Sequence, residues 1–136
     1  MPFKYLPHTA DAEFIAEGDS WEEVFSESAK AMLGIICDLK RVEKKIEREI
    51  ELKAKSREDL LHDFLDELLY IFETENLIFK EFKLEIEDTR LRCKCYGERF
   101  DPEKHEAGGL VKAVTYHNLK TWEERGKKFA RVVLDL

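Results

Sequence analysis

Three segments of the chain carry residues whose types and spacing could do chemistry. The first is His8-Thr9-Ala10-Asp11, which directly precedes a strand-like run. In one interpretation Asp11 presents a carboxylate at the rim of a sheet, and His8 and Thr9 order the turn that holds it. In the other, Asp11 or Thr9 hydrogen-bonds neighbouring backbone in an ordinary polar turn. The residues alone leave both interpretations open.

The second segment is the Asp135-Leu136 pair at the other end of the sequence. A strand pattern runs up to this pair, so we expect its α-carboxylate and the Asp135 side chain to be held in place. Carboxylates that share one sheet edge repel each other unless a proton or a cation lies between them. If Asp11 lies at the same edge, the oxygen-only ligand set suits a hard divalent cation such as Ca²⁺ or Mg²⁺. The sequence by itself does not bring Asp11 and Asp135 together.

The third segment is the irregular stretch 97–109, which is rich in glycine and charge, with the residues that follow it. His105 and Lys112 could contact a partner there, and Tyr116 and His117 add polar groups. The alternative is a solvated loop followed by the outer face of a strand. His62 is expected to be a surface residue of a helix and not a ligand.

Two helices and several strands must position these segments. Ser20 and Glu23 form a capping box before apolar residues that recur every three or four positions up to Ile36. A second, similar pattern begins after Ser56 and stops near Asn76, a residue that tolerates the left-handed conformation. Period-two alternation predicts strands over 12–17, 46–54, 82–87, 91–95, 110–122 and 128–136, with a hairpin turn at Gly126.

These patterns predict an α+β fold. Each strand has one polar and one apolar face, as expected for a mixed or antiparallel sheet with helices on one side. We therefore expect a two-layer sandwich in which both amphipathic helices pack on one face of the sheet. The 136 residues suit a single domain over 1–136, since no linker or low-complexity tract interrupts them.

Composition narrows the class of function. Charged residues make up 39% of the chain, well above the roughly 25% that is typical, and glutamine is absent, which is a thermophile signature. The net charge of −7 argues against strong autonomous binding of nucleic acid. Three cysteines, no signal pattern and no apolar run approaching roughly 18 residues predict a cytoplasmic protein that does not enter the membrane.

Four elements in this order resemble the archease family. They are HTAD near the start, YGERFDPEKHE, VKAVTYH, and an aspartate plus an aliphatic residue at the end. The resemblance covers about residues 5 to 136. It departs at Ala12 and Glu13, where the family commonly has an aliphatic residue and a glycine.

The resemblance implies an accessory role in tRNA splicing. Archeases assist the RtcB-type RNA ligase, promote guanylylation of its active-site histidine and multiple turnover, and can broaden its nucleotide use. The family is also associated with a divalent metal, which the resemblance implies to be Ca²⁺, with Mg²⁺ or Mn²⁺ as alternatives. Carried onto this chain, the implied ligands are Asp11, Asp135 and Leu136, and no residue is catalytic.

Two other classes of function remain as alternatives. One is a stand-alone metal-dependent hydrolase with Asp11 and Asp135 as ligands and His105 or His117 as the base. The other is a chaperone-like module that binds unrelated proteins through an exposed apolar patch. Turnover of a phosphoester by the isolated protein would favour the first, and binding of unrelated clients would favour the second.

Overall fold

The computed structural model describes residues 2–6 and 11–136, which form two helices and two antiparallel sheets. The strands are β1 (Phe3–Leu6), β2 (Asp11–Gly18), β3 (Ile46–Lys53), β4 (Leu77–Glu87), β5 (Arg90–Arg99), β6 (Ala113–Val114), β7 (Lys120–Glu124) and β8 (Lys127–Asp135). The helices are α1 (Trp21–Ile36) and α2 (Arg57–Glu75), and a short 3-10 turn, η1 (Leu39–Arg41), follows α1. The predicted α+β fold is confirmed.

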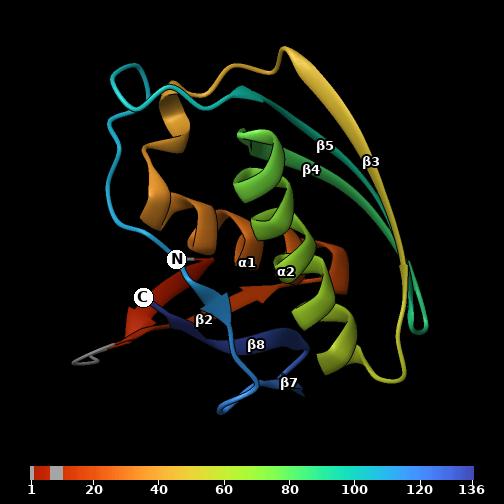
Figure 1. The fold of residues 1–136 in the computed structure, drawn as a ribbon. Helices are drawn as coiled ribbons and strands as arrows, with labels where there is room; N and C mark the ends of the chain where they lie inside the picture. The colour runs from red at the N-terminus through yellow and green to blue at the C-terminus, as the bar shows by residue number, and fades with distance from the viewer. Residues whose placement is uncertain (1, 7–10) are drawn as a thin grey trace.

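The strands divide between two sheets instead of forming the one sheet that the alternation suggested. The first sheet has the order β1-β2-β8-β6, with β7 also pairing with β8, and the second has the order β3-β5-β4. The chain leaves the second sheet after Arg99 and reaches the first only at Ala113. Figure 1 shows α1 and α2 in the space between the two sheets, where each helix packs against strands of both.

Both helices begin at the predicted caps, and α2 ends at the predicted Asn76. The Ser20 hydroxyl accepts a hydrogen bond from the Glu23 amide at 3.1 Å, and the Ser56 hydroxyl accepts one from the Asp59 amide at 3.1 Å. Asn76 ends α2 in the left-handed conformation, with φ of 57°. These contacts satisfy backbone groups that have no partner inside the helix, so the boundaries follow from local sequence.

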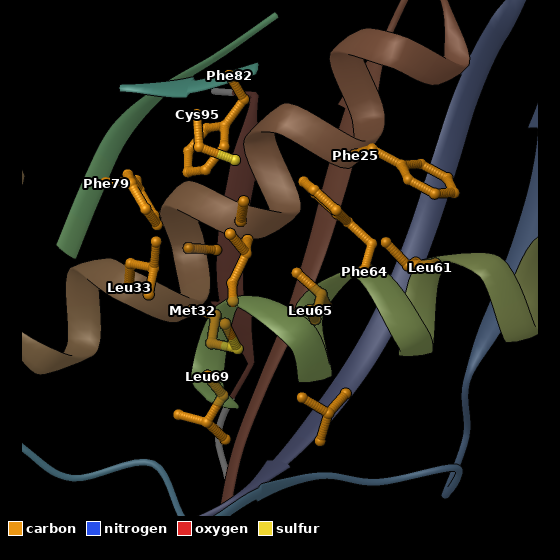
Figure 2. Close-up of a cluster of buried hydrophobic side chains, with 14 of the residues drawn as sticks. Phe25, Met32, Leu33, Leu61, Phe64, Leu65, Leu69, Phe79, Phe82 and Cys95 are labelled. Carbon is orange, nitrogen blue, oxygen red and sulfur yellow. The ribbon is translucent and has the colours of Figure 1, made fainter. Parts of the chain in front are cut away.

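The core lies between the helices and the two sheets. Figure 2 shows apolar side chains of α1 and α2 meeting Phe79 and Phe82 of β4 and Cys95 of β5. Cys93 and Cys95 share the inner face of β5, as their spacing predicts, and their sulfur atoms are 3.6 Å apart. Arg48, which interrupts the alternation of β3, faces inward as well, and its guanidinium reaches Glu75 of α2 at 2.8 Å.

One predicted strand is wrong over most of its length. Residues 110–122 contain only the two-residue β6 and the start of β7. Between them the chain turns, with the Leu119 amide hydrogen-bonded to the Tyr116 carbonyl and Asn118 in the left-handed conformation at φ 55°. Asparagine tolerates this conformation well, and this turn is the reason the strand breaks. The hairpin at Gly126 (φ 79°) forms as predicted.

Candidate functional site

Asp11 and Asp135 come from opposite ends of the sequence and lie side by side in the first sheet. They are register partners in the antiparallel pair β2–β8, so their side chains project from the same face of the sheet. Residues paired in this way have Cβ atoms about 5 Å apart. The two carboxylates that sequence analysis could not place together therefore share one end of the first sheet.

The residues next to this pair also come from distant parts of the chain. The Lys112 amide donates a 2.7 Å hydrogen bond to the Asp135 carbonyl, and Ala113 pairs with Asp135 across β6–β8. Lys112 is exposed, and Leu136 follows Asp135 with 38% of its surface exposed. His8 and Thr9, the predicted supports of Asp11, lie outside the described residues. Asp11, Asp135, Leu136 and Lys112 thus lie together at one rim, which we call the acidic rim.

The donors of the acidic rim fit a hard divalent cation better than a soft one. Two aspartate carboxylates and nearby main-chain oxygens are ligands that Ca²⁺ and Mg²⁺ prefer. Residues 2–6 and 11–136 contain no group of three or more His, Cys, Asp or Glu side chains placed to hold a metal ion. A cation at this rim would therefore be held by Asp11, Asp135 and main-chain oxygens such as that of Leu136.

Glu13 and Arg131 form an ion pair beside the acidic rim that sequence analysis missed. Glu13 is two residues from Asp11, so it projects from the same face, yet only 4% of it is exposed. Its carboxylate accepts a hydrogen bond from the Arg131 side chain of β8. The buried Glu13 carboxylate is thus matched by a cation on the neighbouring strand. The alternation of β2 signals an acidic residue on this face, but it gives no sign of burial.

His105 lies in a different environment from the one that a partner contact requires. Its ring is fully buried and stacks against Phe100. Its Nδ1 accepts a hydrogen bond from the Asp101 amide at 3.0 Å, so Nε2 carries the proton and donates to Glu98 at 2.9 Å. The structure therefore gives His105 the role of anchoring its loop to β5.

Glu98 is the acceptor at the centre of this anchor. Burial alone would raise its pKa, but hydrogen bonds from the Glu43 amide, His105 and Lys104 outweigh burial and lower the pKa to about 2. The carboxylate is therefore ionised near neutral pH, and it holds the loop through contacts that a neutral acid would not favour.

The remaining histidines and the aromatic residue beside them lie on other parts of the surface. The His62 ring stacks on Tyr116 at 4.0 Å between ring centroids, and its Nε2 is 3.0 Å from the Val114 carbonyl. His62 is therefore half-buried in a contact between α2 and β6. His117 is exposed in the turn after β6, and its amide donates to the Thr115 hydroxyl.

No helix among residues 2–6 and 11–136 has both the length and the apolar character needed to cross a membrane.

Comparison with known proteins places the chain in one family. Residues 3–136 match the model of the Archease protein family (MTH1598/TM1083). The chain is 43% identical over 141 residues to Protein archease of Pyrococcus furiosus and 38% identical over 136 residues to that of Sulfolobus acidocaldarius, covering 98% of this chain and of each relative.

Solved structures give the same result. The solution structure of Methanobacterium thermoautotrophicum protein 1598 matches with a TM-score of 0.84 and 40% identity, over 99% of both chains. The crystal structure of an archease described as a possible chaperone, from Thermotoga maritima, shares the fold with a TM-score of 0.71 and 22% identity, over 98% of this chain and 96% of that one. The chain therefore belongs to the archease family.

Proposed function

We propose that this chain is an accessory factor of an RtcB-type tRNA-splicing RNA ligase and is not itself an enzyme. In this proposal it promotes guanylylation of the ligase's active-site histidine, supports multiple turnover and can broaden the nucleotides that the ligase accepts. The protein acts in the cytoplasm, where its three buried cysteines remain thiols.

The observation that carries the proposal is the pairing of Asp11 with Asp135. Family membership makes an accessory role the leading expectation, and the register of β2 and β8 brings two carboxylates to one rim. The acidic rim has the oxygen donors that a divalent cation prefers, and we propose Ca²⁺ as the ion, with Mg²⁺ and Mn²⁺ as alternatives. A bound cation would offset phosphate charge during transfer of the guanylyl group.

The chain's own residues would hold and present the ion. Asp11 and Asp135 provide side-chain oxygens from two adjacent strands, and Leu136 provides main-chain oxygen. Because β8 lies inside the sheet between β2 and β6, it fixes Asp135 more firmly than a free chain end would. Lys112 is held at the same rim by its amide and is available to contact the ligase.

The distribution of charge suits a basic partner. Helix α2 has seven acidic residues and one arginine, so it carries nearly all of the net charge of −7. Complementary charge raises the rate at which two proteins meet and disfavours wrong orientations. An RNA ligase, whose surface must attract phosphate, is such a partner.

The test is a guanylylation assay without RNA. The ligase from the same organism is incubated with GTP, with and without a substoichiometric amount of this protein. The amount of guanylylated ligase formed is measured over time, so that each molecule of this protein must act on several ligase molecules. We expect stimulation by the intact chain and a large loss of stimulation in Asp11→Ala and Asp135→Ala. Glu85→Gln, an acidic position of the second sheet, is the matched control and should stimulate fully.

Two results would overturn the proposal. If the intact chain does not stimulate guanylylation, the accessory role is wrong. Full stimulation by both folded alanine variants removes the acidic rim as the active surface.

A chaperone-like role is the second candidate, because one observation favours it. The outward face of the first sheet carries the half-exposed apolar residues Leu6, Ile15, Trp122 and Phe129. Protection of unrelated unfolding proteins from aggregation, in the absence of the ligase, would support this role. Of the two histidines that the hydrolase alternative offers as a base, His105 is buried and held by Glu98, whereas His117 is exposed in the turn after β6.

A further inference from the structure

The hairpin β7–β8 differs in charge from the rest of the molecule. Residues 120–131 contain five basic residues and only two acidic ones. Helix α2 accounts for a net −6, so the rest of the chain is close to neutral. The overall acidity that argued against nucleic-acid binding is therefore concentrated on one helix, and it does not describe this hairpin.

Aromatic rings lie among these cations. Trp122 of β7 and Phe129 of β8 are register partners, and their rings stack with centroids 5.3 Å apart and planes 11° apart. The Lys120 ammonium lies 5.2 Å from the centre of the Trp122 ring. All three side chains project from the outward face of the first sheet, opposite the helices. The rings are half-buried and Lys120 is exposed.

More cations surround this stack. Lys4, Arg131 and Lys120 lie in one row across β1, β2, β8 and β7, because Lys4 and Arg131 both pair with Ile15, and Lys120 pairs with Arg131. Arg125 is exposed at the tip of the hairpin. Glu13 and Arg131 engage each other on this face, and Lys127 of the hairpin is paired with Asp19, so Lys4, Lys120 and Arg125 are the cations that the inference uses. In this row Arg131 lies four residues before Asp135 along β8, so the row is about 13 Å from the acidic rim.

We infer that the outward face of β7–β8 binds single-stranded RNA, with bases stacking on Trp122 and Phe129 and phosphates contacting Lys120, Arg125 and Lys4. Aromatic rings on an open sheet, flanked by basic side chains, are how many proteins hold single strands. The inference rests on the proposed function, because a factor that works beside an RNA ligase meets exposed RNA ends. It places such an end on the same sheet face as the acidic rim.

The second sheet contains a matched pair that serves as an internal control. Lys83 lies 5.4 Å from the centre of the Tyr96 ring on the outward face of β4 and β5. Tyr96 is flanked in register by Glu47 and Glu81, however, so the surroundings are acidic. The same kind of lysine–ring contact is therefore present on both sheets, but Tyr96 has two glutamates in its row, whereas the Trp122–Phe129 row has one, Glu17, and lies beside the basic row.

The test measures binding of a short fluorescein-labelled oligouridylate to the full-length protein by fluorescence anisotropy, at several salt concentrations. We expect weak binding that declines with salt, a loss of about tenfold in Trp122→Ala, and a loss in Lys120→Ala with a decrease of about 0.7 in the salt slope. Tyr96→Ala and Lys83→Ala should bind like the intact chain. Lys120→Ala leaves both rings in place, so it remains informative if Trp122→Ala fails to fold.

A second readout follows the ring itself. In a Trp21→Phe background, Trp122 is the remaining tryptophan, and oligouridylate should quench its emission, whereas heparin, a polyanion without bases, should not. Quenching by heparin alone, absence of binding at low salt, or equal losses in the Trp122 and Tyr96 variants would each overturn the inference. Weakened docking to the ligase with unchanged RNA binding would also overturn it, in favour of a protein contact. Because the guanylylation assay contains no RNA, its outcome is independent of this one.

Discussion

The outward faces of the two sheets are built from different residues, although both sheets pack their inner faces against the same helices. On the second sheet every outward position in four of the paired rows is charged or a tyrosine, and the remaining row, Ile78-Glu98, is buried beside the loop that His105 anchors. The rows across β3, β5 and β4 are Glu47-Tyr96-Glu81, Glu49-Lys94-Lys83, Glu51-Arg92-Glu85 and Lys53-Arg90-Glu87. The outward rows of the first sheet are instead Asp11-Asp135, Leu6-Glu13-Val133, Lys4-Ile15-Arg131-Lys120 and Glu17-Phe129-Trp122.

Burial shows the same difference. Glu13 and Val133 face outward on the first sheet, yet they are only 4% and 1% exposed. The corresponding positions in the middle of the second sheet, such as Glu51 and Arg92, have side chains 60% exposed. A sheet face that serves only solvation needs no apolar or buried charged groups. Over these rows the second sheet has the face expected from solvation alone, whereas the proposed site lies on the first sheet.

The largest expected effect concerns the cation at the acidic rim. At a hundredfold excess of Ca²⁺ over its dissociation constant, we expect the unfolding free energy of the intact chain to rise by about 2.7 kcal/mol. A chelator should reverse the rise, and Asp11→Asn and Asp135→Asn should abolish it. Thermal unfolding with and without Ca²⁺ measures it, with Glu85→Gln on the second sheet as control. An undiminished calcium shift in Asp135→Asn would place the ion elsewhere.

The next effect compares two arginines that each pair with a glutamate. Arg131→Ala leaves the buried Glu13 carboxylate without its partner on β8, and we expect a loss of about 2 kcal/mol, less than a fully buried pair would cost because Arg131 is itself 41% exposed. Arg92→Ala breaks the exposed pair with Glu51 on the second sheet and should cost less than about 0.5 kcal/mol. Urea denaturation measures both. Equal losses would contradict the difference between the faces.

The third effect is a dependence of stability on pH that arises where the second sheet meets the loop at His105. The folded pKa of Glu98 is about 2, below the value of roughly 4.3 for a free glutamate. The contribution of ionised Glu98 to the unfolding free energy is therefore complete above the unfolded pKa, and it is lost as the pH falls towards 2. Only part of this contribution is lost between pH 4 and pH 3, so we expect a modest decrease in the unfolding free energy over that interval.

Urea midpoints measured across this pH range check the Glu98 prediction. Glu98→Gln should flatten the curve, whereas Glu51→Gln, on the exposed face of the same sheet, should leave its shape unchanged. An identical acid profile in Glu98→Gln and the intact chain would show that another group carries the dependence.

The smallest effect is expected at Lys94, in the middle of the solvated face. It lies between Glu49 and Lys83, so attraction to one neighbour is offset by repulsion from the other. Lys94→Ala should change the unfolding free energy by no more than about 0.5 kcal/mol, as measured by urea denaturation. A larger loss would indicate that this face has a role beyond solvation.

Much of the local structure could be predicted from sequence. The caps at Ser20 and Ser56, the stop at Asn76 and the turn at Gly126 are all present, because each depends on contacts within a few residues. The prediction failed between Val114 and Lys120, where alternation continued through residues that form a turn. Alternation records which side chains are apolar, but it does not record where the backbone reverses.

The candidate site could be predicted only in part. Asp11, Asp135 and Leu136 were identified as oxygen donors, but their proximity depends on the register of β2 and β8. His105 was expected to be accessible, and its burial against Glu98 depends on how loop 101–109 packs beside β5. The Glu13–Arg131 pair was missed because its two members are on different strands.

The sequence by itself determined the helices, most strands, the separation of polar from apolar faces and the residue types available for chemistry. These properties depend on short-range hydrogen bonding and on the period of apolar residues. Tertiary structure decided that the strands form two sheets, that Asp11 lies opposite Asp135, and that Lys4, Arg131 and Lys120 form one row across the first sheet. These outcomes depend on contacts between segments far apart in the chain, which form only when the whole core packs.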